Sequence, residues 1–588
     1  MATVSASPFR RWIFGLALSG LCARVVLGQA ASTDPPAPAV CEGQTISRID
    51  VHAQPPFPLG GPWMLSRVAA LATSFHSTTK EQIVRRYLTL HVGDPCVEFR
   101  RLESERILRA QPFLAAADIV VYPDSGGAGV VLDVATVDEV SLILNGGGAL
   151  TAPLLRAFQL GEANLNGEAM YLSGAWVHSQ FFRDVYRGRF TDYQFLGHPY
   201  QLSVHGSRDE LGGEWDSEVS YPFLTDLQRD SWRMAAGSSD TYIPFRRPGA
   251  IAASLRFERA YGDIGGVHAF GPMGRRILIG GSFSRERERT AAIPVLVLDS
   301  GVFNDTSSVL TGRYGVHNAS RLNLLLGYRD VHFMTVNGFD APEGTQDVRT
   351  GFQLASLFGK GIKLSGDDEP DYFISGDVYA GAGSSTSFLA LETMGEQRFD
   401  PASHGWDAIL GSGRLAWYLK PPLGIGEWRN TLVSDLEFSG GWRQLVPFQL
   451  TLADREGGLP GYQSSDLAGG RRLVARIEDR YGLGHLRQFA GFTGAVFVDA
   501  GRLWAGDVPF GRTTGVKMSA GVSLLAAFPP NSRRAWRIDL AQPLNDRHDS
   551  GFEVRISNQD LTRWFWREPG DVQTSRERSI PNSVYNWQ

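Results

Sequence analysis

The C-terminal part of the chain alternates between apolar and polar residues with a period of two, which is typical of β-strands whose two faces meet different surroundings. In residues 495–501, Phe497 and Asp499 share one face. Val496 and Val498 share the other face, so the charge lies opposite the aliphatic side chains. A soluble sheet turns its apolar face inward, whereas a membrane barrel turns that face out to lipid and keeps charges in its lumen. The period alone allows both.

Several further segments favour the barrel. Helical periodicity is absent beyond Asn145, so no helices are predicted that could cover the apolar face of so large a sheet. Aromatic residues also lie towards strand ends, as membrane interfaces require. Weaker alternating segments recur between residues 168 and 442, separated by Gly, Asp, Pro and Asn. Charged or polar residues lie opposite aliphatic ones in five consecutive C-terminal segments, 473–481, 495–501, 514–524, 536–540 and 551–557.

We therefore predict a mainly β protein, with a transmembrane antiparallel β-barrel over residues 168–566. The segments before residue 459 and the five after it indicate an even total of about 16 strands. Residues 567–588 are polar and are predicted to be a short C-terminal tail, and residues 141–167 a linker into the barrel.

Residues 44–140 have a different pattern, in which β-like and helical periods alternate. They predict a small α+β domain of order β-α-α-β-β. Its predicted elements are a strand at 45–53, a helix between the capping box at 78–81 and Gly93, a second helix at 99–110, and strands at 118–122 and 130–137.

The N-terminus has the layout of a secretory signal peptide. Residues 1–30 contain paired arginines, an apolar core that begins at Trp12 and small residues at 28–30. Residues 31–43 are predicted to be a flexible leader. No later stretch approaches about 18 uninterrupted apolar residues, the length of a membrane helix. The chain is therefore predicted to be exported, either as a secreted protein or as an outer-membrane barrel.

Composition narrows the classes of function. The net charge is -5 over 588 residues, and no arginine-rich or aromatic RNA-binding motif is present, so no nucleic-acid partner is expected. The sequence has no nucleophile elbow, zinc-binding helix, phosphate loop or paired-cysteine motif. We therefore expect no enzyme activity, no cofactor and no metal site.

Cys41 and Cys96 are the two cysteines that follow the predicted signal peptide. An exported pair with no third cysteine is expected to form a disulfide, because its compartment is oxidising. Two free thiols are the alternative.

The N-terminal domain resembles the polypeptide-transport-associated (POTRA) domain, a periplasmic module that precedes outer-membrane translocase barrels. The resemblance lies in the element order and in the phrases TTKEQIVRR (78–86), VGDP (92–95) and LESERILR (102–109). It implies one POTRA domain in the periplasm of a bacterial cell. A Cys41–Cys96 disulfide would then tie the leader to the loop between the two helices.

The region 459–501 resembles the core of the BamA-like superfamily of outer-membrane assembly and translocation proteins. In that family a Val-Arg-Gly-Phe/Tyr motif in the sixth extracellular loop folds into the barrel, where charged residues of the next two strands hold it. Pro222-Phe223 also looks like the family's turn after an early strand. The matching positions are Leu459, Pro460, Gly461 and Tyr462 for the loop motif, and Glu478, Phe497, Asp499 and Gly501 for its lumen partners.

Position 460 departs from the family pattern. Pro460 stands where the family has Arg, so the ion pair from the loop tip to the lumen acids cannot form in the same way. A buried carboxylate without a partner is costly. Other lumen cations could serve Asp499 instead, namely Arg476, Arg480 or Lys517. The alternative interpretation of Leu-Pro-Gly-Tyr is an ordinary turn, because Pro-Gly is a strong turn signal.

The resemblance implies a barrel that assists the insertion or translocation of polypeptides. Its POTRA domain would receive a client by strand addition, and the seam between a first strand near 168–179 and a last strand near 551–558 would help the client into or across the membrane. The implied partners are outer-membrane lipid, an unfolded or β-rich client polypeptide and periplasmic accessory proteins. A passive pore or structural barrel without a protein client is the alternative.

Overall fold

The computed structural model describes residues 38–57, 76–127, 129–148, 155–178, 184–298, 300–341, 344–421, 430–453, 457–463, 465–545, 552–560 and 568–577. The predicted signal peptide at 1–30 and residues 31–37 of the predicted leader lie outside these ranges. Within them, no helix is long and apolar enough to cross a membrane.

The N-terminal domain is a four-stranded sheet with two helices, in the predicted order apart from one additional short strand. The strand order is β2-β1-β4-β3, and the central strands β1 and β4 are parallel. Ile46, Val84 and Leu108 are fully buried between sheet and helices. A disulfide joins Cys41 to Cys96, with 4.9 Å between their Cα atoms. The elements are β1 (Glu42–Gln54), α2 (Glu81–Arg85), β2 (Pro95–Val97), α3 (Glu98–Arg109), β3 (Leu114–Pro123) and β4 (Val130–Asp138).

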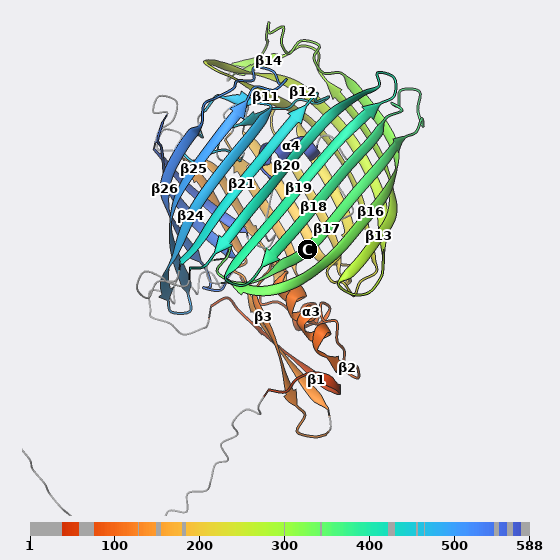
Figure 1. The fold of residues 1–588 in the computed structure, drawn as a ribbon, viewed down its shortest axis with the longest axis vertical. Helices are drawn as coiled ribbons and strands as arrows, with labels where there is room; N and C mark the ends of the chain where they lie inside the picture. The colour runs from red at the N-terminus through yellow and green to blue at the C-terminus, as the bar shows by residue number, and fades with distance from the viewer. Residues whose placement is uncertain are drawn as a thin grey trace, which may run out of the picture.

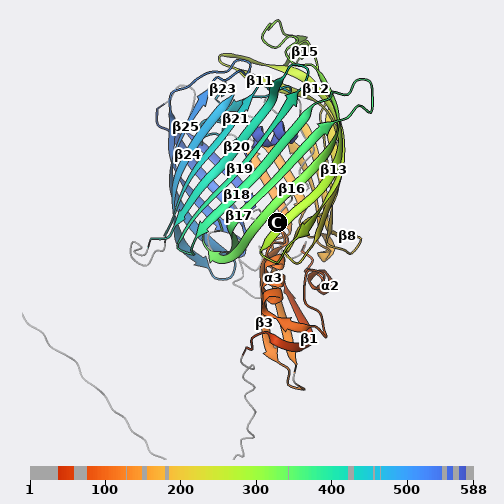
Figure 2. The same cartoon turned by 45° about the vertical axis from the view of Figure 1, so that its right-hand side comes forward.

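The remaining strands form a closed antiparallel barrel, with the N-terminal domain at one mouth (Figures 1 and 2). Of the 22 strands in the closed order, β14 (Val295–Leu298) and β15 (Gly301–Asn304) form a hairpin, and 20 strands make the wall. The first half of the wall consists of β5 (Leu142–Gly148), β6 (Leu155–Glu162), β7 (Met170–Val177), β8 (Val185–Phe195), β9 (Tyr200–Arg208), β10 (Gly213–Tyr221), β11 (Asp230–Arg247), β12 (Ala250–Phe270), β13 (Arg275–Thr290) and β16 (Val316–Asn337). The second half consists of β17 (Thr345–Gly361), β18 (Tyr372–Gly383), β19 (Ser387–Asp400), β20 (Gly405–Leu419), β21 (Asn430–Trp442), β24 (Arg471–Leu486), β25 (Ala490–Trp504), β26 (Lys517–Ala527), β27 (Arg534–Pro543) and β28 (Glu553–Asp560).

The wall has its apolar side out. On β25, Val496 and Val498 are 50% and 46% exposed, whereas Asp499 is fully buried on the lumen side. On β24, Ile477 is 57% exposed and Glu478 is 1% exposed. Charged side chains therefore line the inside and aliphatic ones the outside, which is the arrangement of a transmembrane β-barrel. The predicted fold class is confirmed.

The predicted strand number of about 16 was too low. The predicted linker at 141–167 instead contains β5 and β6, so the wall begins at Leu142 and not near residue 168. β19 was also missed, because its outward face carries polar or small residues, such as Thr393 and Gly395, that interrupt the alternation. β5 was missed because it is a run of apolar residues followed by glycines, with no period of two.

The predicted C-terminal tail at 567–588 is wrong for residues 570–577. They form helix α4 (Gly570–Glu577), which lies inside the barrel between its front and back walls in both views (Figures 1 and 2). Residues 578–588 lie outside the described ranges.

Candidate functional site

The loop between β21 and β24 folds back into the barrel. It contains the short pair β22 (Leu450–Thr451) and β23 (Ala468–Gly469). Leu459 and Tyr462 are fully buried and pack in one apolar cluster with inward side chains of the wall, such as Val474 on β24 and Leu503 on β25. The loop therefore fills part of the lumen at the mouth opposite the N-terminal domain.

The Leu459–Tyr462 segment is a tight turn in its own right. The amide of Tyr462 donates a hydrogen bond to the carbonyl oxygen of Leu459 at 3.2 Å, and Gly461 has a φ of 86°. Pro followed by a residue of positive φ is the chemistry of a type II turn. The segment is thus an ordinary turn by geometry, placed inside the barrel.

Three contacts fix this turn to the last strands of the wall. A Cβ atom on Gly501 would lie 3.1 Å from a methyl carbon of Leu459, so a side chain at position 501 would force the leucine to shift. The amide of Gly461 donates to Glu553 Oε2 on β28 at 2.7 Å. The hydroxyl of Tyr462 donates to the carbonyl oxygen of Met518 at 3.2 Å. The loop tip is therefore attached to β25, β26 and β28.

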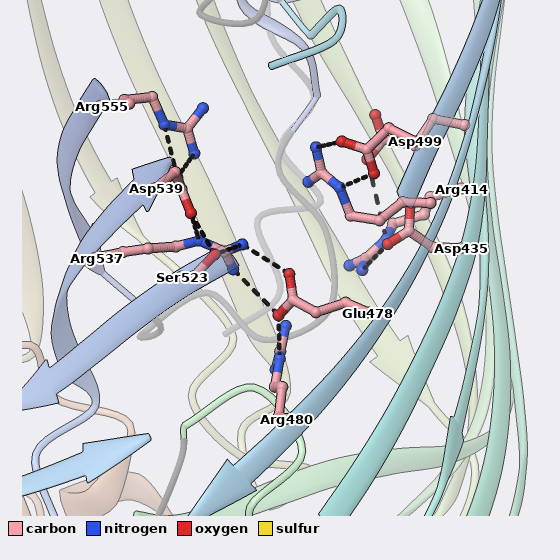
Figure 3. Close-up of polar contacts among 11 residues, drawn as sticks. Arg414, Asp435, Glu478, Arg480, Asp499, Ser523, Arg537, Asp539 and Arg555 are labelled. Atoms are coloured by element: carbon pink, nitrogen blue, oxygen red, sulfur yellow. Dashed lines mark hydrogen bonds and ion pairs between the residues drawn. The ribbon is translucent and has the colours of Figure 1, made fainter. Parts of the chain in front are cut away.

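The acids expected to hold the loop are paired with arginines of the wall (Figure 3). Arg476 donates to both carboxylate oxygens of Asp499, at 2.9 and 3.1 Å. Arg476 and Asp499 are register partners on β24 and β25. A residue of the wall therefore supplies Asp499 with the positive charge that Pro460 cannot provide. Arg476 is one of the three cations predicted for this role.

Glu478 lies at the centre of a second group that crosses the lumen towards β27 (Figure 3). Arg537 donates to its two oxygens at 2.7 and 3.1 Å, and Arg480 donates at 2.5 Å. Arg537 also pairs with Asp539 at 2.6 Å. The guanidinium of Arg537 lies 5.8 Å from the ring centroid of Phe497. Glu478 and Phe497 therefore belong to a network that joins β24 to β27.

A third group holds α4 inside the lumen, and it was not predicted. Arg472 on β24 donates to both carboxylate oxygens of Asp571, at 2.6 and 2.9 Å. Arg576 pairs with Glu396 on β19 and with Glu568, at 2.8 Å for the latter. An acid in the first turn and a base in the last turn complement the helix dipole, and this was the signal in the sequence.

The chain is similar in structure to outer-membrane barrels. BamA from Haemophilus ducreyi lacking POTRA domains 1–3 matches 88% of this chain and 85% of its own, with a TM-score of 0.35 and 12% identity. CdiB from Escherichia coli matches 87% of this chain and 75% of its own, with a TM-score of 0.42 and 11% identity. CdiB from Acinetobacter baumannii matches 88% and 73%, with a TM-score of 0.39 and 8% identity. No family model and no curated protein matches the sequence.

The N-terminal domain is fixed to the turns of one mouth. Arg109 of α3 donates to both carboxylate oxygens of Asp347, at 2.8 and 2.9 Å. Thr225, in the turn that follows Pro222-Phe223, donates to Glu103 Oε2 at 2.5 Å. Burial would raise the pKa of Glu103, but hydrogen bonds from Arg106 and Thr225 and the positive charge of Arg106 hold that pKa below its ordinary value. Ion pairs and hydrogen bonds of ionised side chains therefore hold α3 against the barrel.

A second joint lies beside the barrel closure. Glu139, which follows β4 directly, accepts from Ser532 Oγ at 2.6 Å and from the amide of Arg533 at 3.1 Å, in the turn between β26 and β27. Burial raises the pKa of Glu139, and the charges of Arg534 and Arg533 oppose that rise. β4 then continues within a few residues into β5, which lies beside β28 and closes the barrel.

Proposed function

We propose that this protein is an outer-membrane barrel that assists the insertion or translocation of polypeptides, with its POTRA-like domain in the periplasm. The observation that carries the proposal is the direct path from that domain to the closure of the barrel. The central strand β4 leads into β5, and Glu139 between them is tied to the turn before β27. A client held on the domain is thus delivered next to the seam between β5 and β28.

The seam joins two of the shortest strands of the described wall. β5 has 7 residues and β28 has 8, whereas β16 has 22. Since each ladder position contributes hydrogen bonds, a joint between two such short strands opens at a lower cost than any joint between long ones. This supports the seam as the route for a client, with β5 as the first strand in place of the one predicted near 168–179.

Strand addition on the domain would take place at an outer strand of its sheet, β2 or β3. β2 has only three residues, so β3 is the better edge. That edge is partly covered by the chain itself. Arg101 donates to the carbonyl oxygen of Ile119 at 2.6 Å, and the amide of Ala39 donates to the carbonyl oxygen of Val121 at 2.8 Å. These groups protect the edge of β3 from unwanted pairing, and a client strand would have to displace them.

Photo-crosslinking in living cells tests the proposal. A photoreactive residue at Asp118, which is exposed on β3, is expected to capture nascent polypeptide. The matched control is Asp133, a partly exposed side chain on the central strand β4, which pairs with β1 on one edge and with β3 on the other. Arg101→Ala, which uncovers Ile119, should raise the yield at Asp118. Recovery of lipid alone from Asp118, or equal polypeptide yields at both positions, would contradict client binding.

The alternative of a passive pore is weakened by the contents of the lumen. The inward loop and α4 both occupy the barrel, and Val572 of α4 packs in the same cluster as Tyr462. An open channel would gain nothing from these two segments.

A further inference from the structure

A shallow hollow lies on the wall at the rim opposite the POTRA-like domain. We call it the rim hollow, and its lining residues are His404, Gly405, Trp406, Ile409, Trp442 and Arg443. They come from the start of β20 and the end of β21. Trp406 and Trp442 are 39% and 37% exposed, on the lipid-facing side of their strands. The hollow is therefore located where the wall leaves the membrane.

Two glycines give the hollow its shape. A Cβ atom on Gly440 would lie 2.9 Å from the ring of Trp442, so the far edge of the indole approaches the bare backbone of its own strand. A Cβ atom on Gly405 would lie 3.2 Å from the guanidinium of Arg443. The guanidinium therefore lies across the first residue of β20. The absence of side chains at Gly405 and Gly440 leaves room for both groups.

The backbone around the hollow is strained. His404, Ala408 and Arg443 all have positive φ values, of 53°, 48° and 49°. The register of β19 and β20 shifts at this point, so that Ala408 and Ile409 form a bulge, and the amide of Ala408 donates to the carbonyl oxygen of Arg443 at 2.8 Å. Left-handed conformations of such residues cost free energy and persist where the surrounding structure enforces them, often at binding sites.

Positive charge lies directly beside the indoles. Arg443 forms an ion pair with Asp407 at 2.8 Å, yet its side chain remains 59% exposed. The guanidinium of Arg471 on β24 lies 5.4 Å from the ring centroid of Trp442. An exposed guanidinium has N–H groups in a planar fork that matches phosphate. An indole face is electron-rich and attracts the C–H groups of a sugar ring.

We propose that the rim hollow binds the headgroup of a phosphorylated glycolipid of the outer leaflet. A sugar ring would lie against Trp406 and Trp442, and a phosphate would meet Arg443. The inference rests on the membrane orientation given under the proposed function, but not on the client. A tryptophan of an aromatic girdle can also lie at a rim without an arginine beside it. Trp417, at the other end of β20, is such a residue, with its indole N–H donating to Ser387 at 3.1 Å.

The test is a lipid titration of the purified full-length protein in detergent, followed by native mass spectrometry. The probes are lipid A, which is a bisphosphorylated disaccharide lipid, phosphatidylglycerol, which has the phosphate without the sugar ring, and free inorganic phosphate as a competitor. Wild type is expected to bind lipid A at least tenfold more tightly than phosphatidylglycerol. Inorganic phosphate should compete only weakly. Equal binding of the two lipids would overturn the proposal.

Matched variants locate the site. Trp442→Ala and Arg443→Gln are each expected to lower lipid A affinity about tenfold, which corresponds to 1.4 kcal/mol. The controls are Trp417→Ala and Arg275→Gln at the other rim, where Arg275 is 69% exposed and paired with Asp330 at 3.2 Å. They should leave affinity unchanged. Arg443 is exposed, so Arg443→Gln tests the site even if Trp442→Ala fails to fold. Wild-type affinity in Arg443→Gln, or an equal loss in the controls, would overturn the proposal. The lipid titration contains no client polypeptide. A negative result here therefore leaves the crosslinking test of the proposed function unaffected.

Discussion

The two sides of the barrel wall are built differently. On the far side, β16 and β17 pair without a break from Arg321 to Asn337. On the seam side, β27 and β28 pair only over residues 534–541 of β27, and the strands next to the closure are the shortest in the wall. Long ladders satisfy many backbone groups and resist local opening. The far side is therefore held by its backbone.

On the seam side, side-chain contacts add to the short backbone ladders. Gly461 of the inward loop binds Glu553 on β28, Arg537 on β27 binds Glu478 on β24, and Arg555 on β28 pairs with Asp539 at 3.0 Å. These contacts reach across strands and loops in a way that a ladder cannot. A joint held by side chains can be released by the exchange of a few partners. This difference between the two sides supports the seam as the proposed route for a client.

Hydrogen exchange should reveal the largest difference. Amides of β28 and β5 are expected to exchange about a thousandfold faster than those in the middle of β16 and β17, because local opening of a short joint breaks few hydrogen bonds. The measurement is hydrogen–deuterium exchange with mass spectrometry on the protein in lipid nanodiscs. Equal protection of the two sides would break the comparison.

Replacing one arginine on each side of the wall tests the difference between the two sides more directly. Arg537→Met leaves Glu478 with Arg480 as its remaining partner, and we expect the seam side to lose about 2 kcal/mol, seen as roughly 30-fold faster exchange in β27 and β28. Arg321→Met on β16 removes two equally buried pairs, with Glu286 at 2.7 Å and with Asp371 at 2.5 Å. Because the long ladder remains, exchange in β16 should change less than threefold. A similar acceleration in both variants would show that the ladder does not compensate.

The loop tip gives a smaller effect. Gly461→Ala places a side chain at a φ of 86° and 2.9 Å from Pro543, and should cost about 1 to 2 kcal/mol. The expected readout is roughly tenfold faster exchange in β28, since the amide of residue 461 holds Glu553. The control is Gly515→Ala, in the loop between β25 and β26, where an added Cβ meets no atom within 4 Å. Unchanged exchange in Gly461→Ala would mean that the loop tip does not support the seam.

Much of the wall was predictable because its outer face contacts lipid and its inner face contacts the polar lumen. In β24 to β28 the aliphatic and charged residues alternate with Asp479 of β24 as an exception, and the structure places residues such as Ile477 outside and Glu478 inside as the period predicts. β19 escaped because Thr393 and Gly395 on its outward face carry no apolar signal. The predicted number of strands is therefore limited by the strands with the least regular alternation.

The site was predictable only in part, for a different reason. Arg476 was one of three candidates for Asp499, and only the register of β24 and β25 selects it. Glu553 and Arg537 lie 92 and 59 residues from their partners Gly461 and Glu478, and no local pattern connects them. The position of α4 was missed because a polar segment suits a polar lumen as well as bulk water.

The docking of the POTRA-like domain on the turn between β10 and β11 gives the smallest expected effect. The pKa of Glu103 is lowered in the folded protein from 4.5, because Arg106 and Thr225 stabilise its ionised form. A lowered pKa means that the folded state gives up its proton more readily, so the contribution is present above pH 4.5 and is lost as pH falls through the lowered pKa. We expect exchange in the turn at 222–229 to rise by a few-fold between pH 7 and pH 4, after correction for intrinsic rates, and Glu103→Gln to remove this dependence. If the variant keeps the full pH dependence, another acid controls the docking, and Asp347, which binds Arg109 in the same joint, is the one to test next.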